Sequence, residues 1–331
     1  MKNVTVLGAG SWGSALAMMA GRRNAAVTLW GRDAAQVAEI NRTRTNEKYL
    51  PGVQLGESVT AATNWKSLPV ADLIIFALPS QVMRAMAMEA AHVQISPSTV
   101  LLSCTKGIEK STGCRMSEIL QQCFPGNPVA VLSGPNHAEE IGQKLAAAAV
   151  VGCEDEAVTQ RLQDFFTLPW FRTYRSRDVK GIEWGGATKN VFAIAAGLSE
   201  GLGLGDNARA ALLTRGLAEM IRLGAAEGGN PATFQGLSGV GDLIATCFSH
   251  HSRNNRVGRM LGAGKTLEEI HTSMHMVAEG VPNTESIYLN SRRHGIRTPI
   301  IDQIYSILYQ GKPPKEALTE LLSRGPRAEN E

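Results

Sequence analysis

The sequence predicts an α/β fold in two parts: a doubly wound, mostly parallel sheet over residues 1–178 and an all-α domain over residues 179–331. The first observation is that short, continuous apolar runs alternate with helix-like segments in the N-terminal half. Such runs are typical of strands that are buried on both faces of a parallel sheet. The second observation is a change to helical spacing of the apolar residues after residue 182. At roughly 100–200 residues per domain, the chain is long enough for two domains.

The predicted elements of the N-terminal half follow one another in a regular order. Apolar and β-branched runs predict strands at 4–7, 26–30, 73–77, 100–103, 129–133, 146–152 and 171–174. Helix-like segments lie between several of them, at 15–20, 82–91 and 114–123. In the C-terminal half, glycine and proline turns divide a helical pattern at 201–205, 228–231 and 313–314. Alternating strands and helices give the doubly wound domain, and the helical remainder gives the second domain.

Composition and charge limit the classes of function. The formal net charge of +3 is small for 331 residues and argues against a dedicated nucleic-acid-binding protein. No apolar run approaches the roughly 18 residues that a membrane-spanning helix needs. Met1 and Lys2 lead directly into a strand-like run, which leaves no room for a signal peptide, and the five cysteines are scattered. We therefore expect a cytoplasmic protein that is not embedded in a membrane and binds no nucleic acid.

Two histidines have a spacing that occurs in metal sites. His271 and His275 are four residues apart on a possible helix. However, the glutamate of the H-E-x-x-H motif is missing, and no third ligand is evident. We predict that the protein binds no metal.

A glycine-rich turn lies at the end of the first predicted strand. The segment GAGSWG, from Gly8 to Gly13, follows this strand and opens a helix within a βαβ unit that ends near Trp30. Gly8 permits a tight turn, Gly10 lets the backbone approach a pyrophosphate, and Gly13 lets the helix pack close to the strand. The pyrophosphate would lie at the N-terminus of the helix. The motif and its position predict a Rossmann-type dinucleotide site, with an ordinary glycine-rich turn as the alternative.

The end of the second predicted strand is where a dinucleotide's ribose is usually recognised. Enzymes that use NAD usually have Asp or Glu there. Here the sequence is WGRD, so that Arg32 lies at the tip and Asp33 follows it. A guanidinium pairs well with a 2′-phosphate. We expect NADP to be the preferred cofactor and NAD to be accepted; the alternative is that Arg32 is a solvated surface charge.

Three further segments combine lysine with glycine and small polar residues. The segment SCTKGIE begins at the C-terminal end of a buried strand, the edge at which α/β sheets bind ligands. GATKNV opens the first helix of the second domain, and GVGDL is followed by HSRNNR. Taken singly, each lysine is more simply explained as a solvated charge, and Ser252 as an ordinary helix cap.

Together these segments resemble a known family. GAGSWG, YLPGV, TKGIE, SGP with AEE, ATKNV, GVGDL and SRN, in this order from Gly8 to about Glu279, resemble the bacterial NAD(P)-dependent glycerol-3-phosphate dehydrogenases. One departure is Asn136-His137, where the family more often has Ser or Thr followed by Phe; Asn255 is a second. The resemblance implies an enzyme that reversibly reduces dihydroxyacetone phosphate to sn-glycerol 3-phosphate, feeds glycerophospholipid synthesis and forms a homodimer.

The resemblance also implies catalytic roles for Lys189, Lys106 and Asp242. Hydride transfer to a ketone builds negative charge on its oxygen, which needs a proton donor and electrostatic stabilisation. Lys189 fits the general acid if burial or a neighbouring cation lowers its pKa from about 10.4. Lys106 would be that cation and could also hold a substrate hydroxyl. Asp242 would orient Lys189 or accept a hydrogen bond from a substrate hydroxyl. Asn190 and Thr246 are lesser candidates for the role given to Asp242.

The predicted binding residues complete the site. Those for the cofactor are Gly8, Gly10, Ser11, Trp12, Gly13, Arg32, Tyr49, Lys106, Ala138, Arg253, Val277 and Glu279. Those for the substrate, a small phosphorylated triose, are Lys106, Gly134, Asn136, Lys189, Asp242, Ser252, Arg253 and Asn254. Arg253 with Ser252 and Asn254 would supply a guanidinium and short polar donors to the phosphate.

Two other functions stay open. A related dehydrogenase of the same build would act on a 3-hydroxy acid or on 6-phosphogluconate, but Asp242 together with residues 252–254 suits a three-carbon phosphate ester better. A non-catalytic dinucleotide sensor would keep the fold and lose the chemistry. The presence of Lys106, Lys189 and Asp242 together argues against a sensor, because a sensor needs none of them.

Overall fold

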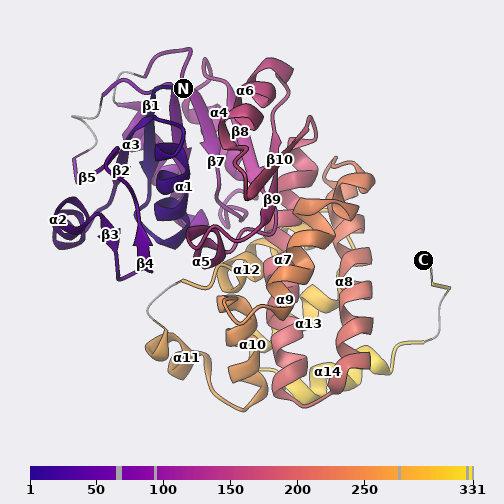
Figure 1. The fold of residues 1–331 in the computed structure, drawn as a ribbon. Helices are drawn as coiled ribbons and strands as arrows, with labels where there is room; N and C mark the ends of the chain where they lie inside the picture. The colour runs from indigo at the N-terminus through magenta and orange to yellow at the C-terminus, as the bar shows by residue number, and fades with distance from the viewer. Residues whose placement is uncertain (65–68, 93–94, 275–276, 326–327, 330–331) are drawn as a thin grey trace.

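An eight-stranded sheet forms the centre of the N-terminal part of the molecule, and helices form the C-terminal part (Figure 1). This computed structural model describes residues 1–64, 69–92, 95–274, 277–325 and 328–329. The strand order is β10-β9-β8-β7-β6-β1-β2-β5. The strands are β1 (Asn3–Leu7), β2 (Ala26–Trp30), β5 (Val59–Ala62), β6 (Leu73–Phe76), β7 (Val100–Ser103), β8 (Val129–Ser133), β9 (Ala147–Gly152) and β10 (Phe171–Ser176).

All neighbouring strands of this sheet are parallel except β8 and β9, which pair antiparallel. The helices of this part are α1 (Ser11–Gly21), α2 (Ala34–Thr43), α3 (Met83–Ala91), α4 (Met116–Cys123), α5 (Ala138–Gly142) and α6 (Glu156–Phe166). Alternate side chains of β6 enter two different cores. Leu73 and Ile75 pack with α1 and α6, whereas Ile74 and Phe76 pack with α3 and α4. Helices thus cover both faces of the sheet, which confirms the predicted doubly wound, mostly parallel fold.

Several elements of the N-terminal part were not predicted. These are helices α2, α5 and α6, strand β5 at the sheet edge, and a separate antiparallel pair, β3 (Thr45–Asn46) and β4 (Leu50–Gln54). The sequence of β5 is VTAA, so small residues weaken its apolar signal. The two strands of the β3–β4 pair are short, and Pro51 and Gly52 lie within β4. Proline and glycine are depleted in strands, so the pattern there resembles a loop.

The C-terminal part contains no strand among the residues described after Arg177. Its helices are α7 (Val179–Gly201), α8 (Gly205–Ala226), α9 (Asp242–Phe248), α10 (Arg253–Gly262), α11 (Leu267–Ser273), α12 (Gly280–Arg293), α13 (Pro299–Gln310) and α14 (Pro314–Leu322). This agrees with the predicted all-α half. Within the described ranges, no helix is sufficiently long and apolar to cross a membrane.

Helix α7 is the centre of the helical part and is buried over nearly its whole length. Glycines let α10 approach it closely. A Cβ atom at Gly197 would lie 2.0 Å from the carbonyl oxygen of Asn255, and one at Gly258 would lie 2.0 Å from that of Ile194. Because real Cβ contacts are never this short, only glycine allows this packing. It brings the start of α10 beside the middle of α7, where Lys189 lies.

Candidate active site

The glycine turn between β1 and α1 is shaped by two glycines and open at a third. Gly8 has a φ of +117°, and a Cβ atom there would lie 2.3 Å from the carbonyl oxygen of Ala77. A Cβ atom at Gly13 would lie 1.8 Å from the carbonyl oxygen of Gly8, but one at Gly10 would meet no atom within 4 Å. The open space at Gly10 lies at the N-terminus of α1, where backbone N–H groups lack helical partners. These residues therefore fit the pyrophosphate of a dinucleotide.

The end of β2 presents a guanidinium. Arg32 is exposed and has no hydrogen-bond or ion-pair partner among the described residues. The carboxylate of Asp33 instead caps α2, because it accepts hydrogen bonds from the backbone N–H groups of Ala35 (3.0 Å) and Gln36 (3.3 Å). Lys48 also lies 3.4 Å from this carboxylate. Asp33 is thus occupied as a helix cap, whereas the guanidinium of Arg32 has no partner in the part of the chain that the structure describes.

A buried carboxylate joins the two lysines that the sequence singled out. Lys189, in the middle of α7, donates from Nζ to Oδ1 of Asp242 (2.9 Å) and to Oγ1 of Thr246 (2.6 Å). Lys106, in the loop after β7, donates from Nζ to Oδ2 of Asp242 (2.6 Å) and to the carbonyl oxygen of Gly134 (2.8 Å). Asp242 is 1% exposed, so this centre is removed from bulk water. Residues that are 136 positions apart in the chain thus meet at one carboxylate.

Burial and the neighbouring charges change the pKa values in this centre. Burial, with the positive charge of Lys106 as a smaller cause, lowers the pKa of Lys189 to about 8, although the carboxylate of Asp242 opposes both effects. Burial acts to raise the pKa of Asp242, but the two ammonium groups outweigh it and hold that pKa below its ordinary value. The carboxylate is therefore ionised near neutral pH. Lys189 can gain and lose a proton near neutral pH, as a general acid must.

A tight glycine turn positions Asp242. A π-helical turn, Leu237–Gly241, precedes α9 and contains the GVG of the GVGDL motif. A Cβ atom at Gly239 would lie 2.0 Å from the carbonyl oxygen of Phe234. A Cβ atom at Gly185 of α7 would lie 2.5 Å from the carbonyl oxygen of Ser238, on the same turn. The turn can therefore pack directly on α7, one helical turn before Lys189. Single-turn π-helices are frequent at functional sites.

The start of α10 lies beside the same part of α7. Ser252 is buried and caps α10, accepting from the N–H of Asn255 (3.1 Å). The side chain of Asn254 donates to Oδ1 of Asn190 (2.9 Å) and accepts from the N–H of Gly280 (2.8 Å). Arg253 is partly buried, and its Nη1 donates to the carbonyl oxygen of Val277 (3.1 Å). Ser252 thus acts as a cap, as its simplest interpretation predicted, and Asn254 holds three helices together.

The remaining predicted cofactor residues are spread around the edge of the sheet. Tyr49 lies in the turn between β3 and β4, and Ala138 begins α5. Both α5 and β4 pack against α1. Val277 is exposed, whereas the carboxylate of Glu279 accepts from the backbone N–H (3.1 Å) and the hydroxyl (2.5 Å) of Ser80. Ser11 is buried and Trp12 is partly buried in the first turn of α1.

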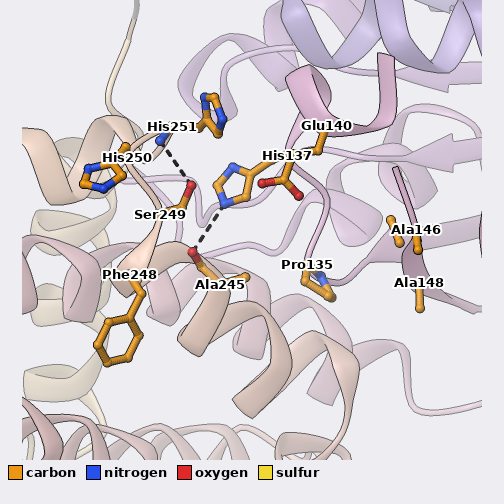
Figure 2. Close-up of a pocket in the computed structure, with 11 residues that line it drawn as sticks. Pro135, His137, Glu140, Ala146, Ala148, Ala245, Phe248, Ser249, His250 and His251 are labelled. Atoms are coloured by element: carbon orange, nitrogen blue, oxygen red, sulfur yellow. Dashed lines mark hydrogen bonds between the residues drawn. The ribbon is translucent and has the colours of Figure 1, made fainter. Parts of the chain in front are cut away.

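His137, the second residue of the unusual pair Asn136-His137, lines a pocket (Figure 2). Asn136 donates from Nδ2 to the carbonyl oxygen of Ala148 (3.1 Å), and its Oδ1 is buried without a partner among the described residues. The Nε2 of His137 lies 3.4 Å from the carbonyl oxygen of Ala245. Burial, and then the charge of Lys189, lower the pKa of His137. The pocket has a volume of about 690 Å³ and is lined by Pro135, His137, Glu140, Ala146, Ala147, Ala148, Ala245, Phe248, Ser249, His250 and His251.

The two histidines with metal-ligand spacing, His271 and His275, do not form a metal site among the described residues. His271 is exposed near the end of α11, and His275 lies outside the described residues. No group of three or more His, Cys, Asp or Glu side chains within the described ranges could hold a metal ion.

Sequence reasoning missed the polar contacts that join the two halves. Glu183 of α7 accepts from Arg115 (2.6 Å) and from the N–H (2.8 Å) and hydroxyl (2.5 Å) of Ser117 at the start of α4. Asn283 of α12 contacts the backbone beside Lys106. No local pattern marks these residues, because each is a single polar residue on an otherwise ordinary helix. Burial in the folded chain alone distinguishes them.

Comparison with known proteins shows the family. The chain matches the model of the NAD-dependent glycerol-3-phosphate dehydrogenase N-terminus over residues 3–159, and that of the C-terminus over residues 178–319. The chain belongs to this family. The predicted family and the predicted enzyme class, an NAD(P)-dependent dehydrogenase, are thereby confirmed.

Relatives of this family match along nearly the whole chain. The glycerol-3-phosphate dehydrogenase [NAD(P)+] of Geobacillus thermodenitrificans is 46% identical, with 99% of this chain and 97% of that protein covered. That of Streptomyces coelicolor is also 46% identical, with 98% and 97% covered. The crystal structure of the Coxiella burnetii glycerol-3-phosphate dehydrogenase superimposes with a TM-score of 0.94 at 35% identity, with 98% and 99% covered. The arrangement described above is therefore the fold of this family.

Proposed function

We propose that the protein transfers a hydride from a nicotinamide cofactor to dihydroxyacetone phosphate and thereby forms sn-glycerol 3-phosphate, in a reversible reaction. The observation that carries the proposal is the buried Lys189–Asp242–Lys106 centre, in a chain whose relatives are named for this activity. A dinucleotide sensor would gain nothing from two lysines held on one buried carboxylate. A ketone reductase needs such a centre, because its substrate oxygen becomes negatively charged.

Lys189 is the proposed general acid for reduction and the general base for oxidation. An ammonium group has three N–H donors. Two of them are given to Asp242 and Thr246, so that one remains for the substrate's carbonyl oxygen. The carboxylate of Asp242 fixes the direction of this donor. A pKa of about 8 lets Lys189 release its proton to the oxygen and recover it from solvent near neutral pH.

Lys106 is proposed to hold a substrate hydroxyl and to lower the pKa of Lys189. Its ammonium gives two N–H donors to Asp242 and to the carbonyl oxygen of Gly134, and one donor remains. Its positive charge disfavours a second positive charge on Lys189. We place Gly134 and Asn136 at the same end of the substrate, because the loop that carries them is bound to Lys106.

The substrate's phosphate is proposed to bind at the start of α10. The guanidinium of Arg253 supplies a charged, forked donor, and Ser252 and Asn254 flank it. Asn254 is held by Asn190, the residue after Lys189, so the phosphate and the carbonyl would be held at a fixed separation. Binding of the phosphate would thus hold the carbonyl beside Lys189, and such positioning of a reacting group lowers the entropic part of the barrier.

The cofactor is proposed to bind across the C-terminal edge of the sheet. Gly8, Gly10 and Gly13 would hold the pyrophosphate, and Arg32 would pair with the 2′-phosphate of NADP, so that NADP is preferred to NAD. When bound, the nicotinamide supplies the hydride. The other proposed contacts are Ser11, Trp12, Tyr49, Lys106, Ala138, Arg253, Val277 and Glu279.

Residues 1–178 and 179–331 are proposed to act as the cofactor-binding and catalytic domains. Their boundary falls between the end of β10 and the start of α7. We further propose a cytoplasmic homodimer whose product serves glycerophospholipid synthesis. Sedimentation of the purified protein at several concentrations tests the dimer.

Oxidation of NADPH by the purified protein with dihydroxyacetone phosphate tests the function. Parallel reactions use NADH in place of NADPH, and 6-phosphogluconate with NADP. We expect turnover with dihydroxyacetone phosphate, faster at low cofactor concentration with NADPH than with NADH. Turnover of 6-phosphogluconate alone would assign the protein to a related reaction, and NADPH binding without any turnover would indicate a sensor.

A further inference from the structure

The loop that carries Lys106 is bound on both sides of that residue by one buried side chain. Asn283 of α12 is fully buried. Its Nδ2 donates to the carbonyl oxygen of Lys106 (3.0 Å), and its Oδ1 accepts from the N–H of Ile108 (3.3 Å). The asparagine amide therefore pairs with the backbone as a neighbouring strand would, although it comes from a helix 175 positions later in the chain.

Packing fixes the residue between these two contacts. A Cβ atom at Gly107 would lie 2.4 Å from Cβ of Ser80 and 2.7 Å from Oδ1 of Asn283. The backbone at Gly107 is thus enclosed between the loop after β6 and helix α12. Ser80 is itself bound by Glu279, at the start of the same helix. The beginning of α12 therefore holds the loops that follow two neighbouring strands.

The rest of this loop follows α12 along its length. Lys110 forms an ion pair with Glu285 (2.8 Å), and Arg293 donates to the carbonyl oxygen of Thr112 (3.2 Å). These partners are exposed or partly exposed, and exposed ion pairs contribute little. Asn283 is the buried contact of the series and the one next to the lysine.

We propose that Asn283 is a positioning residue for Lys106, which holds the Lys106 ammonium on Asp242 and on the carbonyl oxygen of Gly134. The inference rests on the proposed role of Lys106. An amide fits this task because it donates and accepts at once, whereas a carboxylate only accepts. Without it, the backbone at Lys106 is free to shift, and the ammonium moves away from Asp242 and from the carbonyl oxygen of Gly134.

A direct test measures the chemical reactivity of the Lys106 amine. Full-length Asn283→Ala and Asn283→Asp proteins are treated with limiting acetic anhydride, and acetylation of Lys106 is read by mass spectrometry relative to exposed Lys48. The matched control is Asn290→Ala, which removes a buried amide of the same helix that is bound to Glu227. We expect several-fold faster acetylation of Lys106 in both Asn283 variants and an unchanged rate in the control. The Asp variant keeps the side-chain volume and serves if the Ala variant does not fold.

The pH profile of reduction gives the second readout. Loss of the cation beside Lys189 raises its pKa, so the fall of kcat at alkaline pH should move upward by roughly one pH unit. We expect kcat itself to drop by up to about 100-fold, the loss that a displacement of about 1 Å can cause. Wild-type reactivity of Lys106 and an unshifted alkaline limb in both Asn283 variants would overturn the inference. If the wild-type protein does not reduce dihydroxyacetone phosphate, the proposed function fails, and the acetylation rates still decide whether Asn283 positions Lys106.

Discussion

The glycine turn and the lysine–aspartate centre are assembled in different ways. The turn uses six consecutive residues, Gly8 to Gly13, and its shape follows from backbone sterics at Gly8 and Gly13. The centre uses Lys106, Lys189 and Asp242, which come from both halves of the chain and meet only when α7, α9 and the loop after β7 are packed. One site is local and the other is created by the tertiary structure.

Because the two sites are built differently, we propose that they contribute different properties: the glycine turn binds the cofactor, and the lysine–aspartate centre controls protonation. In the glycine turn, close contacts exclude side chains at Gly8 and Gly13, and the space beside Gly10 at the N-terminus of α1 is open. In the centre, burial and charge set protonation, because Lys189 and Asp242 lie away from water and beside each other. Changes in the turn should therefore alter cofactor affinity or stability, and changes in the centre should alter turnover. The following predictions test that separation.

The largest effect is expected for Lys189→Ala. Removal of the proton donor should lower kcat by about 1,000-fold, within the range for general acids, and leave NADPH affinity nearly unchanged. Steady-state kinetics and fluorescence titration with NADPH measure the two quantities. Lys180→Ala is the matched control, because Lys180 is an exposed lysine of the same helix. Its replacement should leave both kcat and NADPH affinity unchanged. Near-normal turnover of Lys189→Ala would show that the proton donor is misassigned.

Two glycines of one turn should respond in opposite ways to the same substitution. Gly13→Ala places a Cβ atom against the carbonyl oxygen of Gly8, and overpacking of this kind should cost about 3 kcal/mol in the free energy of unfolding. Gly10→Ala meets open space and should leave that free energy unchanged while it weakens NADPH binding. Urea unfolding and NADPH titration of both variants measure these effects. Equal destabilisation by both substitutions would contradict the described packing.

The pH dependence of kcat should report Lys189. In reduction the protonated amine is the active form, so kcat should fall by about tenfold per pH unit above the pKa of about 8. In oxidation the neutral amine is active, so kcat should rise with pH through the same region. Profiles measured in both directions check the sign. A reduction rate that rises through pH 8 would exclude Lys189 as the acid.

The smallest effect is expected at the edge of β2. Arg32→Ala removes the proposed partner of the 2′-phosphate and should raise the KM for NADPH by about 10-fold, the value of one charge-assisted contact. The KM for NADH should stay the same, because NADH lacks that phosphate. Asp33→Ala is a useful comparison, since it removes the cap of α2 instead. An equal rise of KM for both cofactors would place Arg32 outside the 2′-phosphate site.

The same contrast explains what the sequence could predict. The buried strands and the glycine turn were predictable because their patterns are local: a continuous apolar run, or glycines at fixed spacing. Lys106, Lys189 and Asp242 were named through family resemblance, and their pairing on one carboxylate was not foreseeable from spacing. Asp33 shows the limit of a local pattern, because its place near the ribose position did not reveal that it caps α2. Asn283 and Glu183 were missed because their importance depends on what packs against them.

In the proposed reaction, the hydride of the cofactor reaches the carbonyl carbon of dihydroxyacetone phosphate in this active site. Incubation of the purified protein with dihydroxyacetone phosphate and NADPH deuterated on the transferred position of C4, followed by NMR of the product, tests it directly. We expect sn-glycerol 3-phosphate with one deuterium on C2. Product without deuterium, or no product while NADPH still binds, would contradict it.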